Sequence, residues 1–487
     1  MSASPPDTIQ RKDHEPLLLW VMNYWHIVRP LLEEAIKKPF NLKEEVLILD
    51  CRTRRDVRVS SLDPKQVVAH AKVVDFEVDV GGVPDDPSLT AAWLNGGLMN
   101  SSLASLAPGD ELVLPNKTFH MMGGIVADGL ADVTVRFEGT VVYDDSMKEW
   151  PRQQSGGRVL ECLKFSRCTN LTLTSSGKAL FNGQGKAWWG LPGVGYLARG
   201  EDRPRLLDIE DSAHTLVENL YLQNSPYWTF NWHGAQADGL EVRNVDISAR
   251  RDGKDDHGLI EETAFNTDGF DVAGKNVHIH DCTVWNQDDT VCAKDGSENM
   301  LFERIEASGV GLTIGSIGGN SVNRNITFRD IHMHKPVKGI YMKFRDSGLV
   351  EDITYENIVI DEPEQTAIWI GPAQQSDSDN VCAAHPCSLC WPLVPGTRCN
   401  LPDGGQYRNI TLRNVTVNSP KKPVSYVMAN ASVPMDGVRF IDVVINNPGT
   451  REGKNFYTHC EGVSRGVTTG KTSPVPSCFT DMTDTHA

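Results

Sequence analysis

Residues 217–222 read V-E-N-L-Y-L, and the same pattern of apolar and polar positions returns seven more times along the chain. Each copy has apolar residues at its first, fourth and sixth positions and Asn, Asp or Arg at its third. The later copies are V-R-N-V-D-I (242–247), I-H-D-C-T-V (279–284), F-E-R-I-E-A (302–307), F-R-D-I-H-M (328–333), Y-E-N-I-V-I (355–360), L-R-N-V-T-V (412–417) and F-I-D-V-V-I (440–445). Such alternation over a few positions is typical of β-strands.

The spacing of these copies decides between fold classes. They begin 25, 37, 23, 26, 27, 57 and 28 residues apart. A β-strand–helix–β-strand unit needs about 30 residues or more, and a β-propeller blade places four strands in about 40 residues. One strand pattern per short repeat instead predicts an all-β, single-domain right-handed parallel β-helix. The two long intervals contain insertions, residues 252–262 and residues 362–405.

The domain organisation follows from where this repeat is present. The chain has 487 residues, more than one ordinary hydrophobic core holds, but a repeat fold grows along one axis. We predict one β-helix domain over residues 71–480, in which the first part resembles the cap of such a solenoid. Residues 1–70 lack the repeat, and apolar residues at helical spacing over 16–38 predict a partly helical N-terminal extension.

Composition limits the partners of the protein. A net charge of −17 at pH 7 argues against a nucleic-acid partner, because nucleic-acid binding requires a basic face. No apolar run is long enough to cross a membrane, so we expect no membrane partner. We expect a monomer without a metal or cofactor. His278 and His280 lack a matching third ligand and are interpreted as strand residues.

The eleven cysteines are distributed unevenly. Six lie in the C-terminal part of the chain: Cys382, Cys387, Cys390, Cys399, Cys460 and Cys478. The spacing of the first four fits the paired C-x2-C rule of structural zinc sites poorly, so it favours disulfides over a zinc knot. The odd total leaves a free thiol, for which Cys51 and Cys292 are candidates.

Three aspartates recur at the spacing of one coil. Asp268 ends the motif Asn266-Thr267-Asp268, and it lies 20 residues before Asp288 and 21 before Asp289. Because neighbouring strands lie about 4.8 Å apart, we expect the three carboxyl groups to converge on one wall. Glycoside hydrolysis needs one protonated carboxyl and one carboxylate. Mutual repulsion in such a cluster raises at least one pKa while a neighbour stays ionised, so the cluster supplies both states.

The order of these motifs resembles glycoside hydrolase family 28, whose pattern reads N-T-D, D-D, G-H-G and R-I-K. Residues 266–268 and 288–289 match the first two blocks outright, and the similarity covers roughly residues 72–480. The resemblance implies that Asp288 is the general acid, and that Asp268 and Asp289 hold and deprotonate a water. It further implies inversion of configuration, for which acid and base lie about 6.5–9.5 Å apart. Asn266 and Lys343 are the binding residues carried over with these blocks.

The sequence departs from the family pattern at two positions. Val310 stands in place of the histidine of G-H-G, and Tyr341, which we keep as a candidate substrate-binding residue, stands in place of the arginine of R-I-K. Valine cannot help to set a proton on a carboxyl group, and tyrosine cannot form a bidentate pair with a galacturonate carboxylate. Arg345 is expected on the same strand face as Lys343, where it replaces the missing cation or forms a surface ion pair with Asp346 or Glu351.

Other candidate binding residues carry two interpretations each. Lys294 either points into the cleft or forms a salt bridge at its rim with Asp295 or Glu298. Trp228, Trp285 and Trp369 are candidate sugar-stacking platforms, although packing between coils is the stronger interpretation for each.

Secretion is predicted from the cysteines, the family resemblance and seven N-x-S/T sequons, although the N-terminus shows no clear signal peptide. The sequon asparagines are Asn100, Asn116, Asn170, Asn325, Asn409, Asn414 and Asn430. At least four of them belong to N-[LIV]-T strand repeats, where Asn and Thr serve the structure equally well. We expect an extracellular protein.

These features together predict an inverting glycoside hydrolase that acts on a pectin-like polysaccharide, of the polygalacturonase type. A rhamnogalacturonan or xylogalacturonan hydrolase remains open as an alternative. So does a catalytically inactive glycan-binding β-helix, against which the three retained aspartates argue. A polysaccharide lyase has only Lys343 in its support. The choice between internal and terminal cleavage depends on whether the insertions at 252–262 and 362–405 close an end of the cleft.

Overall fold

A computed structural model describes residues 71–190, 200–250, 264–375, 380, 382–448 and 457–482. The predicted extension over residues 1–70, with its expected helix and Cys51, lies outside the described residues, and so does the insertion at 252–262. The division of the chain near residue 70 therefore stays a prediction.

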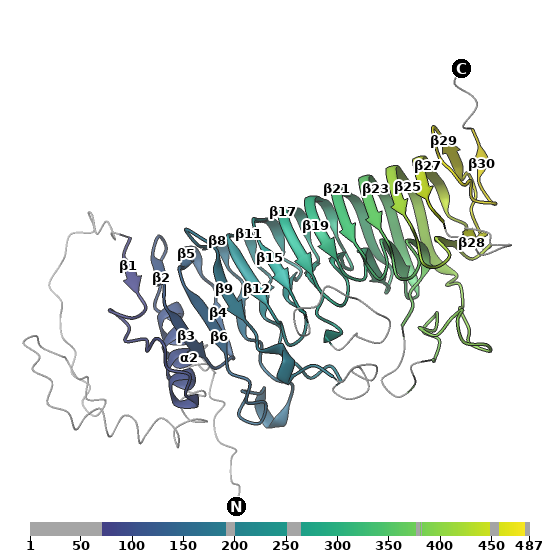
Figure 1. Ribbon diagram of the computed structural model, residues 1–487. Coiled ribbons are helices and arrows are strands. Elements are labelled where there is room, and N and C mark those ends of the chain that lie inside the picture. The colour runs from purple at the N-terminus through teal and green to yellow at the C-terminus, as the bar shows by residue number, and fades with distance from the viewer. Residues whose placement is uncertain are drawn as a thin grey trace, which may run out of the picture. The chain divides into compact units, whose positions relative to one another are not determined.

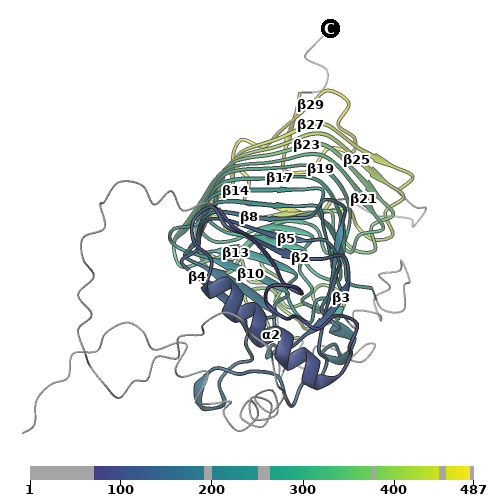
Figure 2. The same ribbon diagram turned by 90° about the vertical axis from the view of Figure 1, so that its left-hand side faces the viewer.

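The described chain begins with a cap. Strand β1 (Val73–Asp75) is followed by helix α2 (Leu89–Ala104), which lies across the first coil of the stack (Figure 2). Ser88 caps the helix by accepting a hydrogen bond from the Ala91 amide. The buried Asn95 side chain donates to the carbonyls of Val83 and His120, which fixes the helix to the coil beneath it. The cap expected from the sequence is therefore present.

Beyond the cap, parallel strands stack coil upon coil (Figure 1). A sheet with 11 strands in the described residues consists of β4 (Ile125–Asp128), β7 (Leu163–Ser166), β10 (Leu207–Glu210), β13 (Phe230–His233), β16 (Phe270–Val272), β18 (Val291–Ala293), β20 (Leu312–Ile317), β22 (Ile340–Phe344), β24 (Ile368–Pro372), β26 (Ser425–Met428) and β28 (Tyr457–Glu461). We call it the short-strand sheet.

The remaining strands form a 19-stranded sheet, which we call the long-strand sheet. Besides β1 it contains β2 (Glu111–Leu114), β3 (Thr118–Met121), β5 (Ala131–Phe137), β6 (Thr140–Tyr143), β8 (Thr169–Thr174), β9 (Ala179–Asn182), β11 (Ala213–Glu218), β12 (Leu220–Gln223), β14 (Asp238–Arg243), β15 (Asp246–Ser248), β17 (Lys275–Trp285), β19 (Glu298–Ser308), β21 (Ser321–His334), β23 (Ser347–Asp361), β25 (Gly404–Asn418), β27 (Asp436–Asn446), β29 (Val467–Thr469) and β30 (Thr480–Asp481). Two short 3-10 helices, Gln154–Gly156 and Gly185–Ala187, lie in connections.

The register of the long-strand sheet reproduces the sequence repeat. The first residues of the eight copies are aligned partner by partner: Val217, Val242, Ile279, Phe302, Phe328, Tyr355, Leu412 and Phe440. All eight are fully buried, and the rings of Phe302, Phe328 and Tyr355 follow one another at centroid distances of 4.8 and 4.6 Å. The predicted right-handed parallel β-helix is confirmed.

The polar third position of each repeat forms a bend. All eight residues there have φ between 50° and 58°, a left-handed conformation that Asn and Asp tolerate better than most residues. Their side chains also bond between coils: Asn357 Nδ2 donates to Asp330 Oδ1 at 2.7 Å, and Asn414 Nδ2 to Asn357 Oδ1 at 2.8 Å. We call this row of inter-coil bonds the asparagine ladder.

A second row of such bonds contains three of the seven sequon asparagines. Asn325 Nδ2 donates to Asn299 Oδ1 at 2.8 Å, and Asn170 and Asn409 bond to aspartates of neighbouring coils in the same way. Together with Asn414, these are the sequon asparagines in the strand repeats, and each amide has a structural partner. Their occurrence therefore follows from the fold.

Disulfides and not a zinc knot hold the cysteine-rich segments. They join Cys382 to Cys390, Cys387 to Cys399 and Cys460 to Cys478. In the described chain the free thiols, Cys292 among them as predicted, are buried. Within these same ranges, no helix has both the length and the apolar character needed to cross a membrane.

Candidate active site

The outward side of the short-strand sheet carries the candidate site. Asp271, Cys292, Thr313 and Tyr341 are aligned partners on β16, β18, β20 and β22. Successive side chains of a strand point to opposite faces, and the residues between them line the core, so this row points out of the solenoid.

The three predicted aspartates lie at one end of this row. They occupy the turns that lead into β16 and β18, and oxygens of Asp268, Asp288 and Asp289 lie within 4.8 Å of one another. The predicted convergence therefore occurs, and one oxygen of each residue lies closer to the others than the separation of about 6.5–9.5 Å that the resemblance implies for acid and base. The carboxyl groups lie close together because Asp288 and Asp289 are neighbours in one turn, and Asp268 lies on the adjacent coil, whose strands are about 4.8 Å apart.

Asp289 is the member of the cluster whose pKa is lowered. Its carboxylate accepts hydrogen bonds from Lys343 Nζ at 2.7 and 3.0 Å and from Thr313 Oγ1 at 3.0 Å, and the residue is 2% exposed. Burial alone would raise its pKa, but the positive charges of Lys343 and Lys294 outweigh burial and lower the pKa below the ordinary value.

Asp288 is held in a different environment. Its Oδ2 accepts from the backbone N and the Nδ2 of Asn266, at 3.1 and 3.2 Å, while its Oδ1 accepts from the Asp289 amide at 2.9 Å. Burial and the neighbouring Asp289 carboxylate raise the pKa of Asp288. Adjacent residues therefore have pKa values shifted in opposite directions, which is the condition for an acid and a base in one site.

Asp268 faces a fourth carboxyl group. It is 3% exposed, and burial, Asp271 and Asp288 raise its pKa well above the ordinary value. Asp271 is fully buried on β16 and was not singled out in the sequence. The alternation within β16, where Phe270 and Val272 point inward, is the signal that would have placed Asp271 beside Asp268.

Lys294 belongs to the cluster and not to its rim. Its Nζ lies 3.0 Å from Asp271, 3.6 Å from Asp268 and 3.7 Å from Asp289, and it approaches the ring of Trp228 at 5.0 Å. The alternative of a rim salt bridge with Asp295 or Glu298 is therefore wrong. Two lysines thus lie among the carboxyl groups of the cluster, and both contact Asp289.

A buried arginine, Arg203, forms a hydrogen bond that holds the side chain of Asn266 in place. Arg203 is 1% exposed and donates from Nη1 to the carbonyls of Pro226 and Phe265 and from Nη2 to Asn266 Oδ1 at 3.1 Å. Its guanidinium lies between the rings of Tyr227 and Phe265, at 4.8 and 4.3 Å. Asn266 in turn donates to the Asp288 carboxyl group and positions it. No pattern in the sequence pointed to Arg203, because its partners are distant backbone carbonyls.

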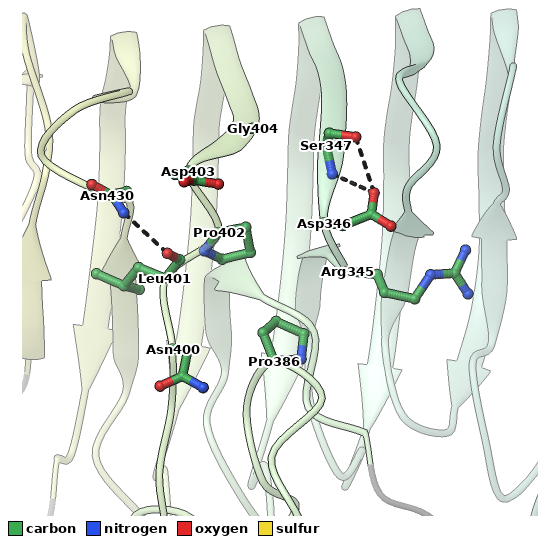
Figure 3. Close-up of a pocket in the computed structure, with 10 residues that line it drawn as sticks. All are labelled: Arg345, Asp346, Ser347, Pro386, Asn400, Leu401, Pro402, Asp403, Gly404 and Asn430. Carbon is green, nitrogen blue, oxygen red and sulfur yellow. Dashed lines mark hydrogen bonds between the residues drawn. The ribbon is translucent and has the colours of Figure 1, made fainter.

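Arg345 does not lie with Lys343 in the site. Strand β22 ends at Phe344, so the period-two argument no longer applies at the next position, and Arg345 lies 3.7 Å from Asp295 at the surface. Its interpretation as a replacement cation is wrong, and that of a surface ion pair is right, although the partner is Asp295. Figure 3 shows Arg345 at a pocket of about 420 Å³ that none of the three site aspartates lines.

Tyr341 is covered. It is 3% exposed, its hydroxyl accepts from the Gln374 amide at 3.3 Å, and the ammonium groups of Lys338 and Lys343 lie over its ring. Trp369 is likewise buried by packing, whereas Trp228 and Trp285 are partly exposed. Lys294 of the cluster lies over the ring of Trp228, and Arg250 lies over that of Trp285. The sequence interpretation of Tyr341 as a residue that touches substrate has no exposed surface to support it.

Val310 joins the site to this covered region. Its amide donates to the Asp288 carbonyl at 2.8 Å, and its side chain packs against a cluster that contains Tyr341, Trp369 and Tyr426. The preceding Gly309 is required by space, since a Cβ there would lie 2.2 Å from Thr290 Oγ1. The flanking glycines of the motif therefore keep a structural role while its central residue has become apolar.

Comparison with known proteins agrees with the family resemblance of the sequence. A model of the family described as Glycosyl hydrolases family 28 matches residues 110–388, more than half of the chain. A probable endopolygalacturonase C of Aspergillus aculeatus is 34% identical over 209 residues, which are 42% of this chain and 51% of that protein. The match thus spans about half the length of this curated relative.

Two solved structures share the fold. An endo-xylogalacturonan hydrolase from Aspergillus tubingensis matches with a TM-score of 0.58 and 18% identity, over 84% of this chain and 99% of that one. A hyperthermoactive exopolygalacturonase from Thermotoga maritima matches with a TM-score of 0.56 and 16% identity, over 77% of this chain and 86% of that one. At such low identities the likeness concerns the fold alone.

Proposed function

Because the chain belongs to glycosyl hydrolases family 28, we propose that it hydrolyses glycosidic bonds of a pectin-like, galacturonate-containing polysaccharide. The observation that carries this proposal is the opposite pKa shift of two adjacent aspartates, raised for Asp288 and lowered for Asp289. Glycoside hydrolysis requires this pair of states within one site. The related Aspergillus protein is named as an endopolygalacturonase, which supports the same substrate class.

In this proposal Asp288 is the general acid. It is the most exposed of the three aspartates, and its raised pKa keeps a proton available for the leaving oxygen. Asp289 is the general base, because Lys343 and Thr313 hold it ionised beside the place of an attacking water. Asp268, whose pKa is raised, orients that water from the other side.

We further propose that the reaction inverts the anomeric configuration. Retention requires a carboxylate that reaches the anomeric carbon and forms a bond to it. Asp289 is 2% exposed and both of its oxygens bond to protein groups, so it is suited to hold a water rather than to attack the sugar. Proton NMR during the first turnovers tests this point: a product that keeps the substrate's configuration would exclude the proposal.

A second candidate is hydrolysis of rhamnogalacturonan or xylogalacturonan. It is favoured by one observation, the burial of Tyr341 where the family pattern has an arginine that pairs with galacturonate. Lys343 and Lys294 are both engaged by aspartates of the cluster, so a sugar without a free carboxylate fits the position next to the acid.

We also propose that the protein acts outside the cell as a monomer. Three disulfides in the described chain support an oxidising compartment, where such bonds persist. Residues 71–480 are proposed as the catalytic domain and residues 1–70 as a separate extension. Gel filtration with light scattering tests whether the protein is a monomer, and mass spectrometry of the secreted protein tests its location outside the cell.

The deciding experiment incubates the protein with polygalacturonate, rhamnogalacturonan and xylogalacturonan, beside Asp288→Asn. We expect new reducing ends with one of these polymers and their loss in the variant, which preserves the shape and the hydrogen bond from the Asp289 amide. Products that absorb in the ultraviolet would indicate a lyase. Binding of a polymer without cleavage would indicate the inactive glycan-binding alternative.

A further inference from the structure

The outward row of the short-strand sheet changes character immediately beyond Thr313. The aligned partners that follow it are Tyr341, Trp369, Tyr426 and His459. The first three point out of the solenoid, yet they are 3%, 1% and 3% exposed. Another segment of the chain takes part in their burial, because Cys387, Trp391 and Leu401 pack in the same cluster as these rings. On this side of the aspartates, the sheet is therefore covered.

The covering segment is the cysteine loop, which we define as residues 382–402. Its Trp391 lies with its ring 6.1 Å from Trp369, 5.4 Å from Tyr426 and 5.2 Å from His459. Cys387 of the loop is fully buried in the same cluster. Aromatic groups at these distances form a packed cover over three successive coils rather than a passing contact.

Several bonds fix the loop in this place. Two disulfides lie within it, and Cys387 bonds through its backbone to Ala373 and Gln375, at 3.1 and 3.0 Å. Gln374 Nε2 donates to the Trp391 carbonyl at 2.9 Å. At the far end of the loop, Asn430 Nδ2 donates to the Leu401 carbonyl at 3.1 Å, as Figure 3 shows. The cover is thus part of the folded domain and not a segment that must be displaced.

The cover reaches the catalytic coil. Val310, whose amide bonds to the Asp288 carbonyl, packs against the cluster beneath the loop. Gln375 extends further back, since its Nε2 donates to Ser316 Oγ at 2.9 Å at the end of β20. Tyr341, the first ring of the cover, lies on β22, two coils beyond β18, which follows the turn of Asp288. Since coils are spaced by about 4.8 Å, the aromatic cover begins roughly 10 Å along the axis from Asp288.

The opposite side of the aspartates has a different surface. The same row continues there through Asn231, Asp208 and Lys164 on earlier strands. Charged side chains prevail there, with Trp228 among them: Arg205 lies 4.7 Å from the Trp228 ring and 3.8 Å from Asp208, and Lys164 bonds to Asp208 and Glu210. The next aligned residue of the row, Val126, is 41% exposed. A polysaccharide bound at the aspartates finds polar groups in this direction and an aromatic wall in the other.

From this asymmetry we infer that the cysteine loop closes one end of the cleft and restricts the enzyme to the ends of polysaccharide chains. The inference rests on the proposed hydrolase function and adds its mode of action. An internal segment of a polymer must extend past the aspartates in both directions, and the packed loop prevents this on the side of Tyr341. A chain terminus needs only the one or two positions that remain.

The test is the product distribution at low conversion, with viscosity followed in parallel. We expect the wild type to release the terminal mono- or disaccharide from the first minutes while viscosity falls slowly. A ladder of oligosaccharides with a rapid fall in viscosity would overturn this inference and leave the hydrolase function intact. Absence of new reducing ends with every polymer would overturn the proposed function, and this inference with it.

A loop variant identifies the cause. Trp391→Ala removes the aromatic cover while both disulfides remain, so we expect the exclusive release of terminal sugars to be lost and longer products to appear. Leu393→Ala is the matched control, because Leu393 lies in the same loop and is 64% exposed; its products should equal those of the wild type. Terminal release that persists in a correctly folded Trp391→Ala protein, judged by circular dichroism, would remove the loop as the cause.

Discussion

The two sheets of the solenoid place outward-pointing charges in opposite environments. On the long-strand sheet, Arg413 and Glu356 pair across adjacent coils with side chains that are 51% and 27% exposed. On the short-strand sheet, Lys343 and Asp289 pair across coils with side chains that are 11% and 2% exposed. Both are lysine- or arginine-to-carboxylate pairs in the same fold, so the difference lies in desolvation and not in architecture.

This difference indicates what each sheet contributes. Exposed ion pairs add little stability, because water already solvates both partners. A buried cluster of four carboxyl groups and two lysines costs free energy unless every charge is neutralised, and such clusters are typical of catalytic sites. The long-strand sheet carries the repeat and its ladders, whereas the short-strand sheet carries groups with shifted pKa values.

The largest effect is expected for Asp289→Asn, which removes the charge that sets the short-strand sheet apart. The amide cannot deprotonate a water, so we expect kcat to fall on the order of 10²–10⁴-fold, the usual contribution of a general base. Initial rates of reducing-end formation measure the loss. The variant Asp295→Asn serves as the control, since this half-exposed aspartate is near in sequence but contacts Arg345 at the surface.

A smaller effect on rate, with a distinct signature in pH, is expected for Lys343→Met. Lys343 lowers the pKa of both Asp289 and Asp288, and it touches Asp289 directly. The base must be ionised, so activity is lost as pH falls through the pKa of Asp289. The acid must be protonated, so activity is lost as pH rises through the pKa of Asp288.

Without the ammonium group both pKa values rise, and the limb at low pH should move upward more than the limb at high pH. We expect a rate loss on the order of 10²-fold from the misplaced carboxylate as well. The pH profile of kcat/KM, compared between Lys343→Met and the wild type, measures the shift of each limb. An acid limb that stays in place would show that Lys343 does not hold Asp289 ionised.

The sequence predicted the long-strand sheet far better than the short-strand sheet. The eight repeat positions align residue by residue, because burial every second position and a polar bend leave a periodic signal. The three aspartates were predicted for the same reason, since Asp268 lies one coil before the pair Asp288 and Asp289. Arg203 was missed because its partners are backbone carbonyls far away in the sequence. Arg345 was misplaced because strand β22 ends one residue before it.

The cover over Tyr341 was equally hidden from the sequence. The cysteine loop begins more than 40 residues after Tyr341 in the chain, and its connectivity depends on which cysteines pair. No periodic pattern relates the two segments. The sequence therefore shows that Tyr341 stands where the family pattern has an arginine, and that the contact made by this arginine is lost. Only the structure shows that the cysteine loop covers this position instead.

The asparagine ladder provides the third way to test the comparison, through stability rather than activity. Asn357→Ala removes a donor to Asp330 and an acceptor for Asn414, and it places alanine at a φ of 56°. We expect the free energy of unfolding to fall by about 2–3 kcal/mol from lost hydrogen bonds and left-handed strain. Asn357→Gly should restore only the part of the lost free energy of unfolding that comes from left-handed strain. Urea denaturation measures both, and kcat should remain at the wild-type value in each.

The smallest effect is expected for the exposed pair, in Arg413→Ala. The guanidinium lies 3.3 Å from Glu356 but remains half exposed, so its removal should lower the free energy of unfolding by about 0–1 kcal/mol. Any contribution should shrink between low and high salt, because exposed charges are screened over roughly 10 Å at 0.1 M. Lys343→Met, by contrast, leaves a buried carboxylate and should cost about 3–5 kcal/mol with little dependence on salt. Equal, salt-sensitive losses in the two variants would mean that burial does not distinguish the two sheets, and the assignment of the catalytic cluster by its buried charges would lose its physical basis.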